Sequence, residues 1–231
     1  MLDRIEKLQL WVEEKEVGCL IVDNPLDIFY VCGVQVSSGR LLVYPREAEL
    51  FVDGRYFEMC KEGSGVPVSL LENDNHLRHI LDHTPMVHSI AFDSVYTAYS
   101  SYDKIVGYIR EQGKKDVVML PYEAPLQDIR VIKDEGEIQK LRDAADLGNK
   151  GFEYGCSLLQ EGVTEAEIAR EVEIFWKREG VEKPAFDLNI SFGSHSSMPH
   201  HKPGSRQLRK GDIVLMDIGV TVENYASDMT R

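Results

Sequence analysis

Two aspartates at matched positions of one expected hairpin constrain this 231-residue chain more than any other feature. Residues 213–216 are an unbroken apolar run, typical of a buried strand, and Asp217 follows them directly. Apolar positions continue through residues 220–226 and are broken by the polar pair Glu223-Asn224, which favours a turn. A chain that folds back there places Asp217 and Asp228 opposite one another, or one diagonal step apart, on one face.

Two carboxylates in this arrangement repel each other, and like charges across a hairpin are destabilising. A cation removes the conflict, because hard metals prefer carboxylate oxygens and two carboxylates can bridge a pair of ions about 3.5–4 Å apart. Taken singly, each aspartate also fits a structural role, as a turn residue or as a helix cap. The pair on one hairpin favours a metal site with Asp217 and Asp228 as ligands.

Charge and composition exclude several other classes of function. The net charge is −13 and no long basic run occurs, which argues against nucleic acid or an anionic membrane as a partner. No apolar stretch approaches the ~20 residues that a membrane helix needs, and the amino terminus has no secretory pattern. The scattered cysteines predict reduced core thiols in a cytoplasmic protein. They are Cys19, Cys32, Cys60 and Cys156.

Short apolar runs between turn residues dominate the first half of the chain. Residues 3–16 predict an amphipathic helix. Strands are expected at residues 18–22, 28–32, 41–44, 49–52, 67–71, 89–92 and 115–120. Helical patches are expected at residues 56–61, 77–81 and 99–113. This alternation predicts an α/β domain over residues 1–125.

The remaining residues, 126–231, are expected to form a second domain after a connector at 126–133. A long helix is predicted from Asp134 to about residue 161. Its glycines favour close packing against another element over a break, and they are Gly148, Gly151 and Gly155. A capping box at 164–167 predicts a second helix, which Gly180 ends. A strand at 186–192 and a loop at 193–209 lead into the hairpin.

The loop before the hairpin is rich in His, Ser, Gly and Pro. Its imidazoles, His195, His200 and His201, lie within seven residues and can bind metal, hold substrate oxygens or transfer protons near neutral pH. The alternative is a solvated polar loop in which the adjacent histidines are incidental. Because the loop leads directly into the strand that carries Asp217, we expect His200 and His201 to bind substrate. No role is assigned to His195.

In combination, these motifs resemble the prolidase and Xaa-Pro aminopeptidase branch of the pita-bread metallopeptidases, a family that also includes creatinase-like enzymes. Three runs carry the resemblance in the second half: Gly193 … Pro199-His200, residues 211–219, and residues 225–231. The connector region at 130–145 and the segments 27–33 and 53–56 extend it over nearly the whole chain.

The resemblance implies a fold and a reaction. Residues 1–125 would form a creatinase-like mixed-sheet α/β domain, and residues 126–231 the first half of a pita-bread α+β catalytic domain. Asp217 would bind one of two divalent ions and Asp228 would bridge both, with manganese expected ahead of cobalt or zinc. His200 would be the catalytic histidine that contacts substrate or the developing tetrahedral intermediate. The reaction would be hydrolysis of an Xaa-Pro peptide bond.

In the family, the remaining ligands are a histidine and two glutamates well downstream of the second aspartate, whereas this chain ends at Arg231. The sequence therefore predicts an incomplete site, a chain that is inactive alone, and exposed apolar surface that promotes homodimerisation or aggregation. One alternative is a non-catalytic peptide-binding or interaction module on the same fold. Creatine hydrolysis, methionine removal and an accidental carboxylate pair are further alternatives. Aminopeptidase and dipeptidase specificity both stay open.

Overall fold

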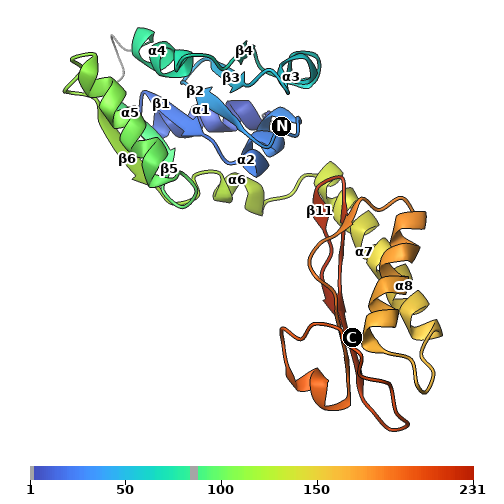
Figure 1. Ribbon diagram of the computed structural model, residues 1–231. Coiled ribbons are helices and arrows are strands. Elements are labelled where there is room, and N and C mark those ends of the chain that lie inside the picture. Colours follow the sequence, from blue (N-terminus) through green and yellow to red (C-terminus); the bar gives the residue numbers. More distant parts are fainter. Residues whose placement is uncertain (1–2, 84–87) are drawn as a thin grey trace. The chain divides into compact units, whose positions relative to one another are not determined.

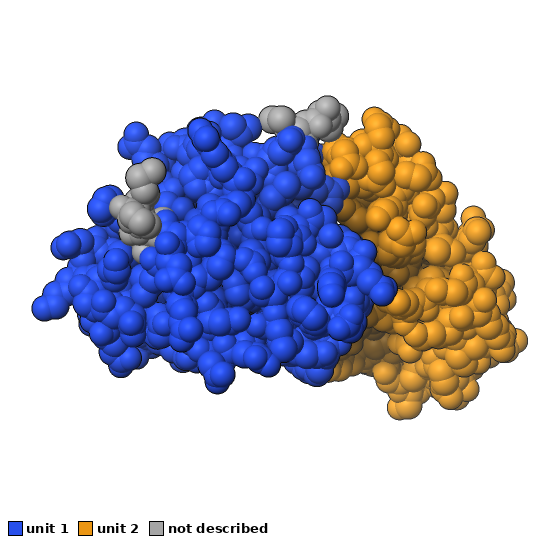
Figure 2. Space-filling model, turned by 90° about the horizontal axis from the view of Figure 1, so that it is seen from above, with its two compact units in different colours: residues 1–132 blue, residues 133–231 orange. Residues whose placement is uncertain are grey.

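The computed structural model describes residues 3–83 and 88–231 (Figure 1). The contacts divide the chain into two compact units, Met1–Ile132 and Lys133–Arg231 (Figure 2). The division falls after α6 (Gln127–Val131), a short helix within the segment expected as a connector. Within the described residues, no helix has both the length and the apolar character needed to cross a membrane.

A six-stranded mixed sheet forms the centre of the first unit. Its strand order is β4-β3-β2-β1-β5-β6, in which β1 pairs antiparallel with β2 and parallel with β5. The strands are β1 (Cys19–Val22), β2 (Gly39–Val43), β3 (Ala48–Val52), β4 (Val68–Leu70), β5 (Ser89–Asp93) and β6 (Val118–Tyr122). The expected mixed-sheet α/β domain is confirmed.

Helices cover both faces of this sheet (Figure 1). Because side chains alternate along a strand, Leu20 and Val22 point into one core while Cys19 and Ile21 point into the other. The first core includes residues of α1 (Arg4–Glu14), α2 (Pro25–Cys32) and α3 (Phe57–Gly63). The second includes residues of α4 (Asn75–Asp82) and α5 (Tyr99–Glu111).

The strand expected at residues 28–32 is wrong, because these residues belong to helix α2. Asn24 caps the helix by accepting the Leu26 amide at 3.0 Å, and Pro25 occupies the first turn, where no amide donor is needed. Gly33, with φ at 73°, ends it in the left-handed conformation. A short apolar run does not distinguish strand from helix by period, and here the flanking caps decide the outcome.

The thiols follow the expected pattern with one exception. All four cysteines are free, and Cys19, Cys32 and Cys60 are buried. Burial raises the pKa of Cys19 and of Cys32 to about 12, so both stay protonated at neutral pH. Cys156 is exposed, near the end of α7 (Glu135–Ser157), and the prediction of a core thiol is wrong there.

The second unit consists of two helices packed against two small sheets. The helices are α7 and α8 (Glu165–Arg178), and each begins with a capping box, at Asp134 and at Thr164. One sheet has the order β12-β9-β8 and the other β11-β10-β7. Their strands are β7 (Lys183–Pro184), β8 (Asn189–Phe192), β9 (Val214–Ile218), β10 (Val220–Val222), β11 (Tyr225–Ala226) and β12 (Met229–Thr230).

Close packing along α7 explains its glycines. A Cβ on Gly151 would overlap the indole of Trp176, whose Nε1 donates to the Leu147 carbonyl at 2.9 Å. A Cβ on Gly155 would lie 3.1 Å from a methyl group of Val172. The glycines therefore let α7 approach α8 closely. This confirms the prediction that they mark close packing and do not break the helix.

Candidate metal and substrate site

The predicted hairpin forms with its turn at Glu223-Asn224. Both residues have positive φ, 45° and 69°, as a tight two-residue turn between antiparallel strands requires. Val222 pairs with Tyr225 beside the turn, and further along the hairpin Asp217 pairs with Thr230.

The hairpin changes from one small sheet to the other at Gly219. A Cβ on Gly219 would overlap the carbonyl oxygen of Ser227, so the two strands approach there too closely for any other residue.

This register places Asp217 and Asp228 on one face as diagonal neighbours. Asp217 lies directly opposite Thr230, whose hydroxyl donates to its Oδ1 at 2.7 Å, and Asp228 precedes Thr230 by two residues. Diagonal neighbours of this kind have Cα atoms roughly 7–8 Å apart. Asp217 is half-buried and Asp228 is exposed. The geometric part of the prediction, a shared face at one diagonal step, is confirmed.

Both aspartates line one pocket, with a volume of about 730 Å³. Helix α8, the segment before β8 and the loop before the hairpin form its other walls. They contribute Ala166, Ala169, Arg170, Glu173, Phe186, Asp187, Leu188, Asn189, Pro199, His200, His201, Lys202 and Pro203. The structure therefore brings every residue expected at the site, Asp217, Asp228, His200 and His201, to one cavity.

The donor set fits a divalent cation. Two carboxylates share a face and a cavity, and within residues 3–83 and 88–231 neither forms an ion pair with a basic side chain. The other acidic groups nearby in sequence are engaged elsewhere. Asp212 pairs with Arg206 at 3.2 Å, and Glu223 pairs with Lys140 at 3.0 Å. Oxygen ligands of this type suit hard or borderline metals.

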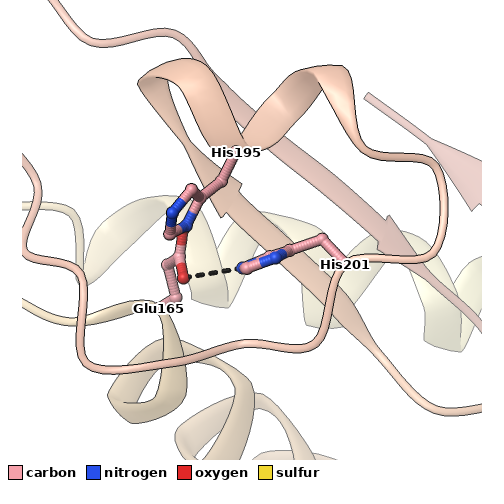
Figure 3. A group of neighbouring side chains, drawn as sticks. All are labelled: Glu165, His195 and His201. Carbon is pink, nitrogen blue, oxygen red and sulfur yellow. Dashed lines mark hydrogen bonds and ion pairs between the residues drawn. The ribbon is translucent and has the colours of Figure 1, made fainter.

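The two neighbouring histidines differ in their surroundings. His200 is exposed at the pocket, whereas the side chain of His201 is only 12% exposed and its Nε2 lies 2.9 Å from Glu165 Oε2. His195 lies in a short 3₁₀ turn, Gly193–Ser197, with its Nδ1 2.9 Å from Glu165 Oε1. Figure 3 shows both rings converging on this carboxylate.

Glu165 is the residue that the sequence analysis missed. It is fully buried at the start of α8, and its oxygens also accept the amides of Phe192 at 2.9 Å and Gly204 at 3.1 Å. Burial alone would raise its pKa. The bond from His201, the two amides and the bond from His195 outweigh burial and hold the pKa of Glu165 below its usual value.

The local sequence contains no feature that separates Glu165 from an ordinary first-turn glutamate. In the motif Thr164-Glu-Ala-Glu167, a glutamate near the helix start is accounted for by the capping box and the helix dipole. The partners of Glu165 lie 27 to 39 residues away, so only the tertiary structure brings them together. Glu165, His195 and His201 also have the composition of a metal-binding group, with ligand atoms within 4.8 Å of one another.

Comparison with known proteins supports the resemblance to the prolidase and Xaa-Pro aminopeptidase family along the whole chain. Residues 4–132 match the creatinase/prolidase N-terminal domain, and residues 139–231 match metallopeptidase family M24. An Xaa-Pro dipeptidase of Pyrococcus furiosus is 30% identical over 232 residues, which cover 100% of this chain and 64% of the relative. An uncharacterized peptidase of Staphylococcus aureus (strain USA300) is 46% identical over 237 residues, which cover 100% of this chain and 65% of the relative.

Solved structures agree with the fold. An Xaa-Pro dipeptidase from Bacillus anthracis superimposes with a TM-score of 0.89 at 25% identity, over 98% of this chain and 63% of that chain. Prolidase from Pyrococcus furiosus superimposes with a TM-score of 0.85 at 28% identity, over 99% of this chain and 69% of that chain. The two units thus define a two-domain metallopeptidase fold, and the paired carboxylates lie in the second unit.

The chain belongs to the creatinase/prolidase family, with a metallopeptidase M24 region in its second unit. It spans about 64% of the length of the Xaa-Pro dipeptidase that it matches.

Proposed function

We propose that this chain contributes the amino-terminal domain and the first two metal ligands of a peptidase that hydrolyses Xaa-Pro bonds at a dinuclear metal site. One observation carries the proposal. The hairpin register puts Asp217 and Asp228 on one face of the same pocket that His200 lines. The Xaa-Pro dipeptidases among the relatives supply the substrate class.

Asp217 and Asp228 are the residues that would hold the ions, and we propose manganese as the metal. When bound, divalent ions of such a site polarise the substrate carbonyl and lower the pKa of water. The carboxylate of Asp217 is already oriented by Thr230, which removes part of the ordering cost of binding.

The other pocket residues would act on the peptide itself. His200 is exposed and lines the cavity, and it would donate a hydrogen bond to the substrate oxygen that becomes negative during attack. The side chains of Phe186 and Pro203 provide apolar wall against which a pyrrolidine ring can pack. His201 also lines the cavity, but its bond to Glu165 makes it a wall residue in this proposal.

Two carboxylates make a weak site, because dinuclear centres of this family draw on further ligands. We therefore propose that the 231-residue polypeptide, tested by itself, binds Mn²⁺ weakly and does not turn over substrate. Activity would require additional ligands, which an extension by the part of the relative outside the matched 64% would supply.

The test combines calorimetry with hydrolysis assays. Mn²⁺ is titrated into the 231-residue chain, into Asp217→Asn and into Asp187→Asn. Asp187 is a matched control because it lines the same pocket but lies outside the hairpin pair. We expect Asp217→Asn to weaken Mn²⁺ binding by at least about tenfold and Asp187→Asn to leave it unchanged.

Hydrolysis of an Xaa-Pro dipeptide is then measured for the chain and for its extended form. Turnover by the extended form alone is the expected result. Peptide binding without any requirement for metal would instead identify a non-catalytic binding module. Turnover by the 231-residue chain would contradict the proposed dependence on further ligands.

A further inference from the structure

One side chain, that of Glu165, makes four hydrogen bonds that attach the loop carrying His200 to helix α8. Glu165 Oε1 accepts hydrogen bonds from the Phe192 amide and from His195 Nδ1, both at 2.9 Å. Glu165 Oε2 accepts from His201 Nε2 at 2.9 Å and from the Gly204 amide at 3.1 Å. The carboxylate thus contacts the residue that precedes the loop and three residues within it, His195, His201 and Gly204.

These bonds determine which nitrogen of each ring carries a hydrogen at the contact. An ionised carboxylate only accepts hydrogen bonds, so each contacting ring nitrogen must carry its hydrogen. His195 is therefore the Nδ1–H form and His201 the Nε2–H form at this contact. Both rings lie close together, with centroids 4.4 Å apart, and both converge on Glu165 (Figure 3).

The backbone around Glu165 reinforces the attachment. The Glu165 amide donates to the Arg206 carbonyl at 3.2 Å, and the Ala166 amide donates to the Gly204 carbonyl at 3.0 Å. The first turn of α8 leaves such amides without intrahelical acceptors, and here the loop supplies the acceptors. At the start of α8, the Glu165 side chain therefore accepts hydrogen bonds from the loop, and two backbone amides donate hydrogen bonds to it.

His200 lies between two fixed neighbours. The His201 ring is bound to Glu165, and the Pro199 carbonyl accepts Asn189 Nδ2 at 3.1 Å. Asn189 in turn pairs with Asp217 across β8 and β9. The two residues beside His200 are therefore tied to α8 on one side and to the aspartate-bearing sheet on the other.

We propose that Glu165 is a positioning residue, which fixes His200 over the Asp217–Asp228 face by holding His195 and His201. The inference rests on the proposed function for its catalytic consequence, but the positioning itself is a property of the 231-residue chain. A misplacement of about 1 Å in a catalytic group can cost roughly 100-fold in rate, so such a support affects the chemistry without touching substrate.

A cation held by Glu165, His195 and His201 is the competing interpretation, because their ligand atoms lie within 4.8 Å of one another. The contacts disfavour it. Each carboxylate oxygen already accepts one backbone amide and one imidazole hydrogen, so a metal would have to displace both imidazole hydrogens.

Nitrogen-15 NMR of the histidine rings tests the proposal on the chain itself. In the wild type we expect His195 as the Nδ1–H tautomer and His201 as the Nε2–H tautomer, each with slow hydrogen exchange. Glu165→Gln keeps the shape but replaces one acceptor oxygen by a donor, so at least one of these protected signals should disappear. The ring of His200 should then lose order on the nanosecond timescale, with His79 in the first unit unchanged.

The matched control is Glu167→Gln, which removes a carboxylate from the same helix turn. Glu167 belongs to the capping box, where it accepts hydrogen bonds from Thr164 and, among the described residues, makes none to the loop, so the His200 ring should keep its order in this variant. If Glu165→Gln does not fold, His201→Ala serves in its place, because it removes one imidazole and leaves the two amide bonds of Glu165 intact.

Two results would overturn the proposal. One is a His200 ring that stays equally ordered in Glu165→Gln after the protected signals are lost. The other is loss of those signals on adding diamagnetic Zn²⁺ to Asp217→Asn, which would indicate a cation site at Glu165.

In the extended, active form, Glu165→Gln should lower kcat by about 10–100-fold with little change in KM, because the support acts on the transition state. Equal kcat for this variant and the wild type would contradict the catalytic part. An extended wild type with no Xaa-Pro hydrolysis would instead refute the proposed function, and the NMR result would still decide whether Glu165 orders His200.

Discussion

Asn189 pairs directly with Asp217 across β8 and β9, so the two side chains share a face of the sheet. Asn189 is buried, accepts a hydrogen bond from the Ser191 hydroxyl and donates to the Pro199 carbonyl at 3.1 Å. One side-chain amide, on the strand next to Asp217, thus joins the sheet that carries this expected metal ligand to the loop that carries His200.

Replacing Asn189 by Ala should destabilise the second unit by about 1–3 kcal/mol, because the Pro199 carbonyl and the Ser191 hydroxyl lose a buried partner. Urea unfolding followed by Trp176 fluorescence, in a Trp11→Phe background, reports on this unit. The control is Gln139→Ala, an exposed position on α7, for which a change within about 0.5 kcal/mol is expected. Equal stability of Asn189→Ala and the wild type would show that the side-chain bonds of Asn189 contribute nothing to the stability of the second unit.

Gly151→Ala should destabilise the second unit by about 1–3 kcal/mol or more, since the new methyl group overlaps the Trp176 indole. The matched control is Gly107→Ala within α5, where a Cβ meets no atom within 4 Å. That change should be neutral or stabilising by up to about 1 kcal/mol, because alanine is the better helix former. Thermal unfolding of both variants measures the contrast, and similar losses at both sites would contradict the packing argument.

Acid should weaken the contribution of Glu165 to stability. Its folded pKa lies below the usual 4.5, so on acidification the unfolded state takes up the proton first. The contribution is complete above about pH 4.5 and falls away as the pH drops through the lowered pKa. The stability difference between the wild type and Glu165→Gln should therefore shrink from pH 7 to pH 3. A difference that does not vary with pH would exclude this linkage.

His76 should make the first unit acid-sensitive over a different range. Burial first, and then the charge of Arg40, lower its pKa from 6.5 to about 4. The unfolded state therefore binds the proton at higher pH, so stability declines from about pH 6.5 and the loss is complete below about pH 4. The shift corresponds to roughly 3 kcal/mol. His76→Gln should flatten this part of the profile, and an unchanged slope would refute the assignment.

The sequence was informative where local pattern and tertiary structure agree. The apolar run before Asp217 and the polar pair Glu223-Asn224 set the hairpin register, so the shared face of the two aspartates could be predicted. The capping box at Thr164 likewise marked the start of α8. Each of these features depends on residues that are close in sequence.

The missed features depend on distant residues or on ambiguous periods. The run at 28–32 is apolar on every side, so only its flanking Asn24 and Gly33 distinguish helix from strand. Glu165 looks like any first-turn glutamate until the fold brings His195 and His201 to it. Its role therefore could not be predicted from the residues around it.

The metal site is tested most directly by mapping where Mn²⁺ broadens the amide NMR signals of the 231-residue chain. We expect broadening centred on Asp217 and Asp228 and extending to His200, and its loss in Asp217→Asn but not in Asp187→Asn. Broadening centred elsewhere, or unchanged by the loss of the Asp217 carboxylate, would contradict a metal site on this hairpin.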